Sequence, residues 1–285
     1  MVKDLIAVGC GIIGATVSRA LTARGMDVLT LDDGRPLGGT APSGGHLRPS
    51  WFRGMARSDY EPALSLLDEV WGLLEEEFVV APLGLSASIA RVDTDKVMAH
   101  PRTVATVTGL RHLDNYPVVV MEIDGAGGKR EVREERCRLL LLATGAWAGE
   151  LVAGTAITPK QGVSFRLPGT LSAPFVRPWA PYRQVVGHQQ APGEVWVGDG
   201  SAVLPSNWAP SRTAACLERC RRAARLPNVS PSRTLFGLRP YCTLPAASPC
   251  LLKRLGPRAW LATGAGKLGT IAAGWVARRL IDAHC

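Results

Sequence analysis

The amino-terminal segment constrains the fold more than any other part of the chain. Apolar residues 5–8 precede a G-x-G-x-x-G run at residues 9–14, and residues 12–24 have the periodicity of a helix. A second apolar run, residues 28–31, leads directly to Asp32. This order predicts a strand, a tight turn, a helix and a second parallel strand, which together form the unit that binds a dinucleotide.

Each glycine of this run has a steric role. Gly9 permits the sharp bend, Gly11 leaves room for a pyrophosphate, and Gly14 lets the helix lie close to the strand. The free N–H groups of Ile12 and Ile13, at the start of the helix, would face phosphate oxygens, and the helix dipole favours negative charge there.

An acid ends the second strand. Asp32, which Asp33 follows, lies where a carboxylate can accept hydrogen bonds from both ribose hydroxyls of an adenosine, and it disfavours a 2′-phosphate. The motif does not separate NAD from FAD, because both cofactors present an ADP half to it. A tight strand-helix-strand turn without a ligand is the structural alternative.

Length and composition indicate a globular protein. The 285 residues suit one large α/β unit or two interleaved domains, and the charged and hydrophobic fractions, 20% and 46%, are ordinary. No apolar stretch reaches about 18 residues, and the first strand begins almost at once, so we expect a cytoplasmic protein without a membrane partner.

The charge and the cysteines indicate neither nucleic acid nor a metal. The net charge is +9, with arginines clustered at 219–225 and 278–279, but no nucleic-acid fold signature accompanies them, so we interpret them as solvated helix faces. The seven cysteines are scattered without a C-x-x-C pair. Cys216 and Cys220 lie one helical turn apart without a histidine pair, so we expect reduced thiols and no metal site.

The rest of the chain predicts a mixture of strands and helices with two more glycine turns. A glycine-rich connection, 34–49, suggests close approach to a ligand, and the second and third turns follow apolar strands at 143–148 and 263–270. The predicted helices cover 60–78, 150–152, 213–224 and 271–283. The predicted strands cover 89–92, 104–110, 117–123, 132–136, 138–142, 157–167, 184–188, 194–198 and 259–262, with turns at 115–116 and 125–128. A further buried strand is expected to end just before Arg239 and Pro240.

Three separated blocks resemble one family. Residues 1–45, the turn at 143–147, and residues 237–240 with 263–270 resemble the D-amino-acid oxidase, glycine oxidase and sarcosine oxidase family of FAD-dependent amine oxidases. The resemblance implies an α/β fold, with a Rossmann-type FAD-binding domain and a smaller mixed-sheet α+β substrate domain that is reduced relative to the family. We assign 1–50, 86–150 and 235–285 to the FAD-binding domain, and 51–85 and 151–234 to the substrate domain.

The resemblance also implies which residues hold the cofactor. Gly9, Gly11, Gly14 and Asp32 would hold the ADP half of FAD, and Val107 would offer backbone to the adenine. The residues that the resemblance places beside the pyrophosphate and the flavin are Thr40, Ser43, Gly44, Gly45, Ala143, Thr144, Gly145, Gly266, Lys267, Leu268, Gly269 and Thr270. The last turn would aim a helix N-terminus at the flavin, where reduction places negative charge.

The substrate site is predicted from the same resemblance. Arg239 matches the arginine that grips the substrate carboxylate, with an interdomain salt bridge as the structural alternative. Tyr241 and His46 could face the substrate, although a loop histidine bonded to backbone is as compatible with the sequence. Lys267 replaces an arginine of glycine oxidases, and Tyr182 and Arg183 are weaker candidates.

The chain departs from the family in two ways. The missing length falls largely between residues 51 and 86, so we expect a more open pocket. Such a pocket would accept a longer substrate, or a protein partner or second copy would complete it. The cysteine that carries covalent flavin in sarcosine-oxidising relatives falls on Arg239 rather than Cys242, so we expect non-covalent FAD.

The implied activity is oxidation of an amino acid or a carboxylated secondary amine by hydride transfer to flavin N5. The imine would hydrolyse, and O2 would give hydrogen peroxide. Because the flavin carries out the hydride transfer, we assign no catalytic residue, and we expect a specialised biosynthetic pathway. The alternatives are a NAD-dependent dehydrogenase and a flavin-bearing accessory subunit that docks on a larger enzyme through the arginine-rich helix around Cys220.

Overall fold

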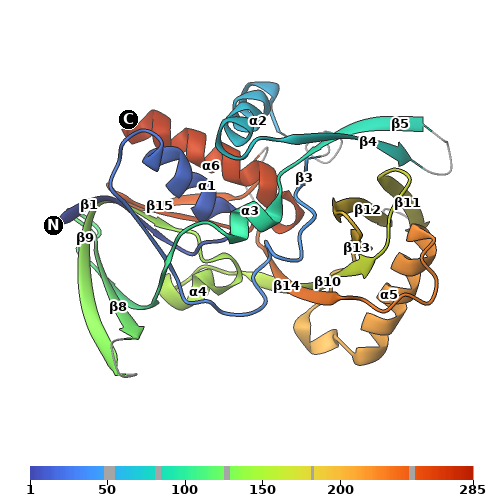
Figure 1. Cartoon of the computed structure of the whole chain (residues 1–285). Helices are drawn as coiled ribbons and strands as arrows, with labels where there is room; N and C mark the ends of the chain where they lie inside the picture. The colour runs from blue at the N-terminus through green and yellow to red at the C-terminus, as the bar shows by residue number, and fades with distance from the viewer. Residues whose placement is uncertain (48–54, 81–84, 125–128, 181–182, 244–247, 285) are drawn as a thin grey trace.

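The computed structural model describes residues 1–47, 55–80, 85–124, 129–180, 183–243 and 248–284. The predicted turn at 125–128 and Tyr182 therefore lie outside the described residues. Two eight-stranded sheets form the framework, with helices packed against them (Figure 1). Within the described ranges, no helix is long and apolar enough to cross a membrane.

The first sheet contains the predicted parallel strands. Its order is β15-β16-β9-β1-β2-β6, and the hairpin of β7 and β8 joins at β9. Val8, at the end of β1, pairs with both Leu31 and Leu142, so the turns after β1, β2 and β9 leave from the same edge. The strands are β1 (Val2–Val8), β2 (Val28–Asp32), β6 (Thr103–Val104), β7 (Thr106–Arg111), β8 (Val118–Asp124), β9 (Arg130–Leu142), β15 (Leu251–Gly256) and β16 (Ala259–Thr263).

Both faces of the first sheet are covered. Leu5 and Ala7 of β1 point to the core under α1 (Ile12–Thr22) and α6 (Gly269–His284), whereas Ile6 and Val8 point to the opposite core. That opposite face packs against the β7–β8 hairpin and α4 (Ala148–Leu151). Alternate residues are buried on both sides, which explains why the sequence shows a continuous apolar run there.

Helix α2 (Arg57–Trp71) packs on α6 and α1 at the side of the first sheet, above α6 in Figure 1. Contact between α2 and α6 is close, because a Cβ on Gly274 of α6 would lie 2.2 Å from the carbonyl oxygen of Ala63. A short helix, α3 (Thr94–Met98), is capped by Asp93, whose side chain accepts a hydrogen bond from the Asp95 N–H.

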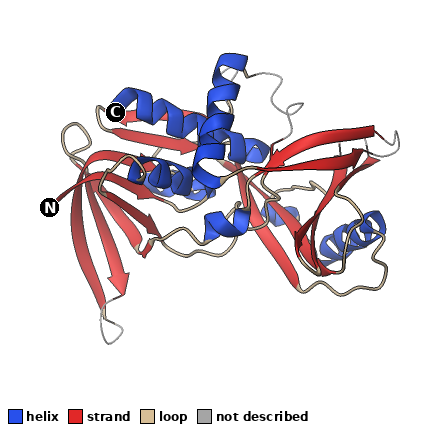
Figure 2. Cartoon of the chain, turned by 45° about the horizontal axis from the view of Figure 1, so that its top comes forward, coloured by secondary structure: helices blue, strands red, loops and turns tan. Residues whose placement is uncertain are grey.

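The second sheet has the order β14-β10-β13-β12-β11-β4-β5-β3 and stands beside the first (Figure 2). Helix α5 (Pro210–Ala224) covers one face, where Cys216 and Cys220 join the core around Phe165. The strands are β3 (His46–Leu47), β4 (Leu74–Val80), β5 (Leu85–Arg91), β10 (Thr158–Pro168), β11 (Phe175–Ala180), β12 (Arg183–Ala191), β13 (Glu194–Gly198) and β14 (Arg233–Tyr241).

Several predicted elements were wrong in extent. The helix expected at 60–78 ends at Trp71, because Gly72 adopts a left-handed φ of 66°, and residues 74–80 form strand β4 instead. The two strands expected at 132–136 and 138–142 are the single strand β9. The first half of β9 pairs antiparallel with β8, and its second half pairs parallel with β1. One strand therefore takes the place of both expected strands. Strands β3, β11 and β15 were not predicted.

The sheets divide the chain at points other than the predicted domain boundaries. β14 pairs along its whole length with β10, which places residues 233–241 in the second sheet, and β5 places residues 85–91 there too. Helix α2 packs on the first sheet's helices, although residues 51–85 were assigned to the substrate domain. The division into domains stays a prediction.

Candidate functional site

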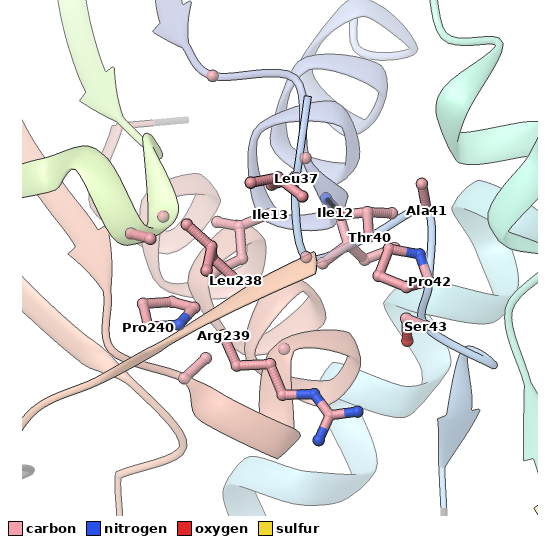
Figure 3. Close-up of a pocket in the computed structure, with 18 of the residues that line it drawn as sticks. Ile12, Ile13, Leu37, Thr40, Ala41, Pro42, Ser43, Leu238, Arg239 and Pro240 are labelled. Carbon is pink, nitrogen blue, oxygen red and sulfur yellow. Dashed lines mark hydrogen bonds between the residues drawn. The ribbon is translucent and has the colours of Figure 1, made fainter. Parts of the chain in front are cut away.

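A cavity of about 700 Å³ lies where the ends of the first sheet's parallel strands face the second sheet. The structure brings the three predicted glycine turns together around it, although they are remote in the sequence. Figure 3 shows part of the lining, with helix α1 beginning near Thr40 and with Arg239 extending from β14. The predicted cofactor residues that line the cavity are Gly9, Gly11, Ile12, Ile13, Asp32, Asp33, Thr40, Ser43, Gly44, Val107, Ala143, Thr144, Gly145, Gly266, Lys267, Leu268, Gly269 and Thr270.

Gly14 and Gly45 shape this cavity without lining it. A Cβ on Gly14 would lie 1.8 Å from the carbonyl oxygen of Gly9, so only glycine lets α1 approach the turn this closely. Gly45 has a φ of 68°, and its Cβ would lie 2.0 Å from the carbonyl oxygen of Val92. The absence of a Cβ at both glycines therefore permits this backbone placement around the cavity.

The first and second glycine turns touch one another. Gly9 has a φ of 97°, and a Cβ there would lie 2.5 Å from the carbonyl oxygen of Ala143. A Cβ on Gly11 would meet only Thr40, whose Oγ1 would lie 3.3 Å away. Gly11 thus leaves open space at the cavity wall, as an approaching phosphate requires.

The backbone N–H groups at the N-terminus of α1 have two different roles, one within the protein and one toward the cavity. The N–H of Ile12 donates to Thr40 Oγ1 at 2.9 Å, which anchors the glycine-rich connection on the helix start. The next N–H groups of the first turn, those of Ile13 and Gly14, have no partner within a helix, because the first four donors of any helix lack one. They are the donors that an anionic group in the cavity can use.

Asp32 connects the first turn to the second strand. Its Oδ2 accepts from the Cys10 N–H at 2.7 Å, and its Oδ1 accepts from the Gly34 N–H at 2.9 Å. Each carboxylate oxygen can accept more than one hydrogen bond, so both keep capacity for ribose hydroxyls. The backbone bonds hold the carboxylate at the cavity edge, where the predicted ribose contact requires it.

Arg239 lies inside strand β14 rather than after a strand, which corrects the expected local context. Its side chain packs beside Gly162, whose added Cβ would come 3.5 Å from the Arg239 guanidinium carbon. Among the residues that the structure describes, its Nη1 has no hydrogen-bond partner and is buried, although the residue lines the cavity. A buried guanidinium donor without an acceptor is costly, and an acceptor that enters the cavity would relieve this cost.

His46 lines the cavity from β3 and belongs to a buried chain of hydrogen bonds. Its Nε2 lies 3.1 Å from His188 Nδ1, and His188 Nε2 lies 2.9 Å from Gln190 Oε1. Because the amide oxygen only accepts, His188 donates from Nε2 and accepts from His46. Burial, and then the charge of Arg91, lower the pKa of His46 to about 3, so both its contacts and its burial favour the neutral form.

The remaining predicted substrate residues are separated. Tyr241 does not line the cavity: its ring lies under Gly266, where an added Cβ would come 2.6 Å from a ring carbon. Arg183 lines the cavity at its exposed rim, and Lys267 lines it from the turn before α6. Trp196 was missed by the sequence analysis, although it lines the cavity with a buried, unpartnered Nε1. It lies on a strand without a motif, so no local signal marks it.

Comparison with protein families gives one match. Residues 84–283 match the family described as DAO, FAD dependent oxidoreductase, and this segment covers more than half of the chain. The chain belongs to this family. Its members bind FAD, and no curated protein matches this flavoprotein by sequence.

Solved structures resemble the whole flavoprotein. Iminodiacetate oxidase from Chelativorans sp. BNC1 is 17% identical with a TM-score of 0.69, covering 96% of this chain and 93% of that one. Glycine oxidase from Bacillus cereus is 16% identical with a TM-score of 0.69, covering 99% and 94%. L-proline dehydrogenase from P. horikoshii is 16% identical with a TM-score of 0.66, covering 97% and 91%. At these identities the likeness shows the shared fold.

The cavity of this flavoprotein fits FAD. The glycines at 9 and 11 leave its wall free of Cβ atoms, the start of α1 offers donors, and Asp32 is held for a ribose. Across the cavity, the turn at Gly266–Leu268 leads into α6, whose N-terminus favours negative charge. These features suit the ADP half of a dinucleotide, and membership of the family makes that dinucleotide FAD.

Proposed function

We propose that this flavoprotein oxidises the C–N bond of an amino acid or a carboxylated secondary amine. The observation that carries the proposal is the buried Nη1 of Arg239, which lines the cavity without a partner. A carboxylate is the acceptor that a guanidinium fork matches best, with two parallel hydrogen bonds. Glycine oxidase and iminodiacetate oxidase, both named for carboxylated amines, share this fold.

The chain's own residues would orient the substrate and shape the electrostatic field. Arg239 would hold the carboxylate, which fixes the direction of the adjacent carbon. Bound FAD supplies the hydride acceptor, N5 of the flavin, for the hydrogen on that carbon. Lys267 and the N-terminus of α6 would stabilise negative charge that develops in the cavity, with the dipole contributing about 0.3 to 1 kcal/mol.

His46 would contribute as a neutral group. With a pKa of about 3 it is a neutral imidazole at neutral pH, and its single N–H, on Nε2, is donated to His188. Its role in this proposal is therefore to shape the cavity wall between Phe78 and Trp196, whose rings lie 5.4 Å from its own. The imine product would hydrolyse in water, and O2 would reoxidise the flavin to give hydrogen peroxide.

Non-covalent attachment of FAD is part of the proposal. Burial raises the pKa of the Cys242 thiol, which disfavours the nucleophilic thiolate that a flavin–sulfur bond needs. Acid precipitation of the loaded protein should release all of the flavin into the supernatant. Flavin that stays with the pellet would contradict this part.

The experiment is anaerobic mixing of the FAD-loaded protein with a panel of carboxylated primary and secondary amines, followed by flavin absorbance. We expect the flavin absorbance to bleach with at least one amine, and hydrogen peroxide to form when air is then admitted. In Arg239→Lys the charge remains but the bidentate fork is lost, so KM should rise by about tenfold or more. An oxidised flavin with every amine would overturn the proposal and favour the accessory-subunit alternative. Bleaching without peroxide would instead indicate a dehydrogenase.

A further inference from the structure

Three cationic side chains, those of Arg183, Arg239 and Lys267, line the cavity, and a fourth, Lys160, is paired with Arg239 in the second sheet. Lys160 of β10 lies directly opposite Arg239 of β14 in the antiparallel register. Arg183 begins β12 and lines the cavity, and Lys267 lines it from the turn before α6. Burial, and then the charges of Arg239, Arg183 and Lys160, lower the pKa of Lys267, in keeping with this placement.

No carboxylate of the protein compensates this cluster. Three cations and no acid act on the pKa of Lys267. The acids that line the cavity, Asp32, Asp33 and Glu150, belong to the opposite end, and the last two pair with Arg35. Residues outside the described ranges include no Asp or Glu. An anionic ligand in the cavity would supply the counter-charge that the protein does not.

Aromatic rings hold two of these cations without neutralising them. The Lys160 ammonium lies 4.8 Å from the centre of the Tyr241 ring, and the Arg183 guanidinium carbon lies 5.5 Å from the centre of the Trp179 ring. A ring face orients a cation and leaves its full charge available to a ligand. Tyr241, which does not reach the cavity itself, thus acts as a positioning residue for Lys160.

One substrate carboxylate does not account for four cations. Arg239 suffices for a single carboxylate through its two parallel donors, and Lys267 adjoins the turn that favours negative charge on the cofactor. Arg183 and Lys160 then remain uncompensated. Keeping like charges together in a partly desolvated site is unfavourable unless a ligand supplies the opposite charge, and such arrangements mark functional sites.

We propose that the substrate carries a second anionic group, such as a second carboxylate, and that Arg183 binds it, with Lys160 adding charge behind it. The substrate class is then a dicarboxylated amine rather than a simple amino acid. This inference rests on the proposed function for the amine, whereas the second anionic subsite can be tested without any oxidation.

The test is a titration of the FAD-loaded protein with unreactive acids of equal length, succinate and butyrate, followed by perturbation of the flavin spectrum. We expect succinate to bind at least about tenfold more tightly, because it adds a charge-assisted hydrogen bond. Arg183→Gln should reduce that preference by about tenfold, and Lys160→Gln should reduce it by less. Arg177→Gln is the matched control, since Arg177 lies on the neighbouring strand β11 and does not line the cavity.

The outcomes separate the two proposals. Equal affinity for succinate and butyrate, no binding of succinate, or a preference that survives in Arg183→Gln and Lys160→Gln would each overturn the second subsite, whatever the oxidation assay gives. A preference that both substitutions weaken, together with an oxidised flavin in every amine mixture, would support the subsite and reject amine oxidation. Loss of preference in Arg177→Gln to the same extent would show a general effect of net charge and would also overturn the subsite.

Discussion

Gly14 stands against the backbone of Gly9 so closely that a Cβ on Gly14 would lie 1.8 Å from the Gly9 carbonyl oxygen. This contact places the start of α1 beside the turn that follows β1, at the cavity. The helix N-terminus can serve a phosphate only while that contact is kept. The pair therefore couples packing of the first sheet to the cofactor site.

Gly14→Ala should destabilise the protein and release FAD. The added methyl group meets backbone that cannot rotate away, so α1 must shift, at a cost of about 3 kcal/mol in the free energy of unfolding. Urea denaturation and flavin retention on a desalting column measure the two effects. Gly109→Ala is the control, because its Cβ would meet Val120 at an ordinary 3.6 Å. Full flavin retention in Gly14→Ala would contradict the expected coupling.

Asp32→Asn should weaken FAD binding by about tenfold to a hundredfold, since a charged acceptor for the ribose becomes a neutral amide. The amide oxygen can still accept one of the two backbone N–H bonds, from Cys10 or Gly34, so the fold should survive with a modest loss of stability. Quenching of flavin fluorescence gives the Kd. Asp27→Asn, at an exposed ion pair with Lys3, should leave the Kd unchanged. Equal Kd values in all three proteins would exclude Asp32 from the ribose site.

The buried histidine pair should make stability depend on pH from about 6.5 down to about 3. Burial lowers the pKa of His46 to about 3 and that of His188 well below its usual value. Above pH 6.5 both folded and unfolded states are neutral at these residues, so nothing is lost. Below pH 6.5 the two histidines bind protons in the unfolded chain but stay neutral in the folded protein. The free energy of unfolding therefore falls by about 1.4 kcal/mol per pH unit for each histidine.

Urea denaturation at pH 7.5, 6.5 and 5.5 tests this dependence, because few carboxylates titrate in that interval. His188→Gln should flatten the decrease between pH 6.5 and 5.5 by about half, whatever its stability at pH 7.5. His112→Asn, at an exposed position, should leave the slope unchanged. A slope in His188→Gln equal to that of the wild type would assign the pH dependence to other groups.

Asp199→Ala should destabilise the second sheet without affecting FAD binding. The Asp199 carboxylate is fully buried and accepts from the Ser201 N–H at 2.9 Å and from Arg219 Nη2 at 2.7 Å. Although burial opposes ionisation, the bonds from Ser201 and Arg219 lower the pKa of Asp199. Removing the acid leaves these donors unpaired, and because Arg219 keeps some solvent contact we expect a loss of about 2 kcal/mol.

Glu218→Ala is the matched control for this prediction. It removes an exposed ion pair with Arg222 on the same helix, α5, and should change the free energy of unfolding by about 0.5 kcal/mol or less. Thermal or urea denaturation measures both variants. Similar losses in Asp199→Ala and Glu218→Ala would show that the buried carboxylate does not anchor α5.

The sequence pattern predicted the structure correctly where neighbouring residues in the chain fix that structure. The turn at 9–14 is fixed by glycine sterics, and the strand at 194–198 agrees with β13 in both bounds. Where the pattern was ambiguous it failed: residues 74–78 continue a helical spacing past Trp71, yet Gly72 reverses the chain and the segment pairs with β5. β9 shows the same limit, because its two halves have partners that only long-range pairing supplies.

The sequence by itself determined the dinucleotide-binding unit and the family, because turns, caps and strand ends depend on neighbouring residues in the chain. Only the tertiary structure decided that Arg183, Arg239 and Lys267 line one cavity and that Lys160 is paired with Arg239, since these residues come from separate strands and a turn. It also decided that Tyr241 lies beneath Gly266 instead of facing a substrate. Charge interaction and packing depend on distance in space, and spacing along the chain does not encode that distance.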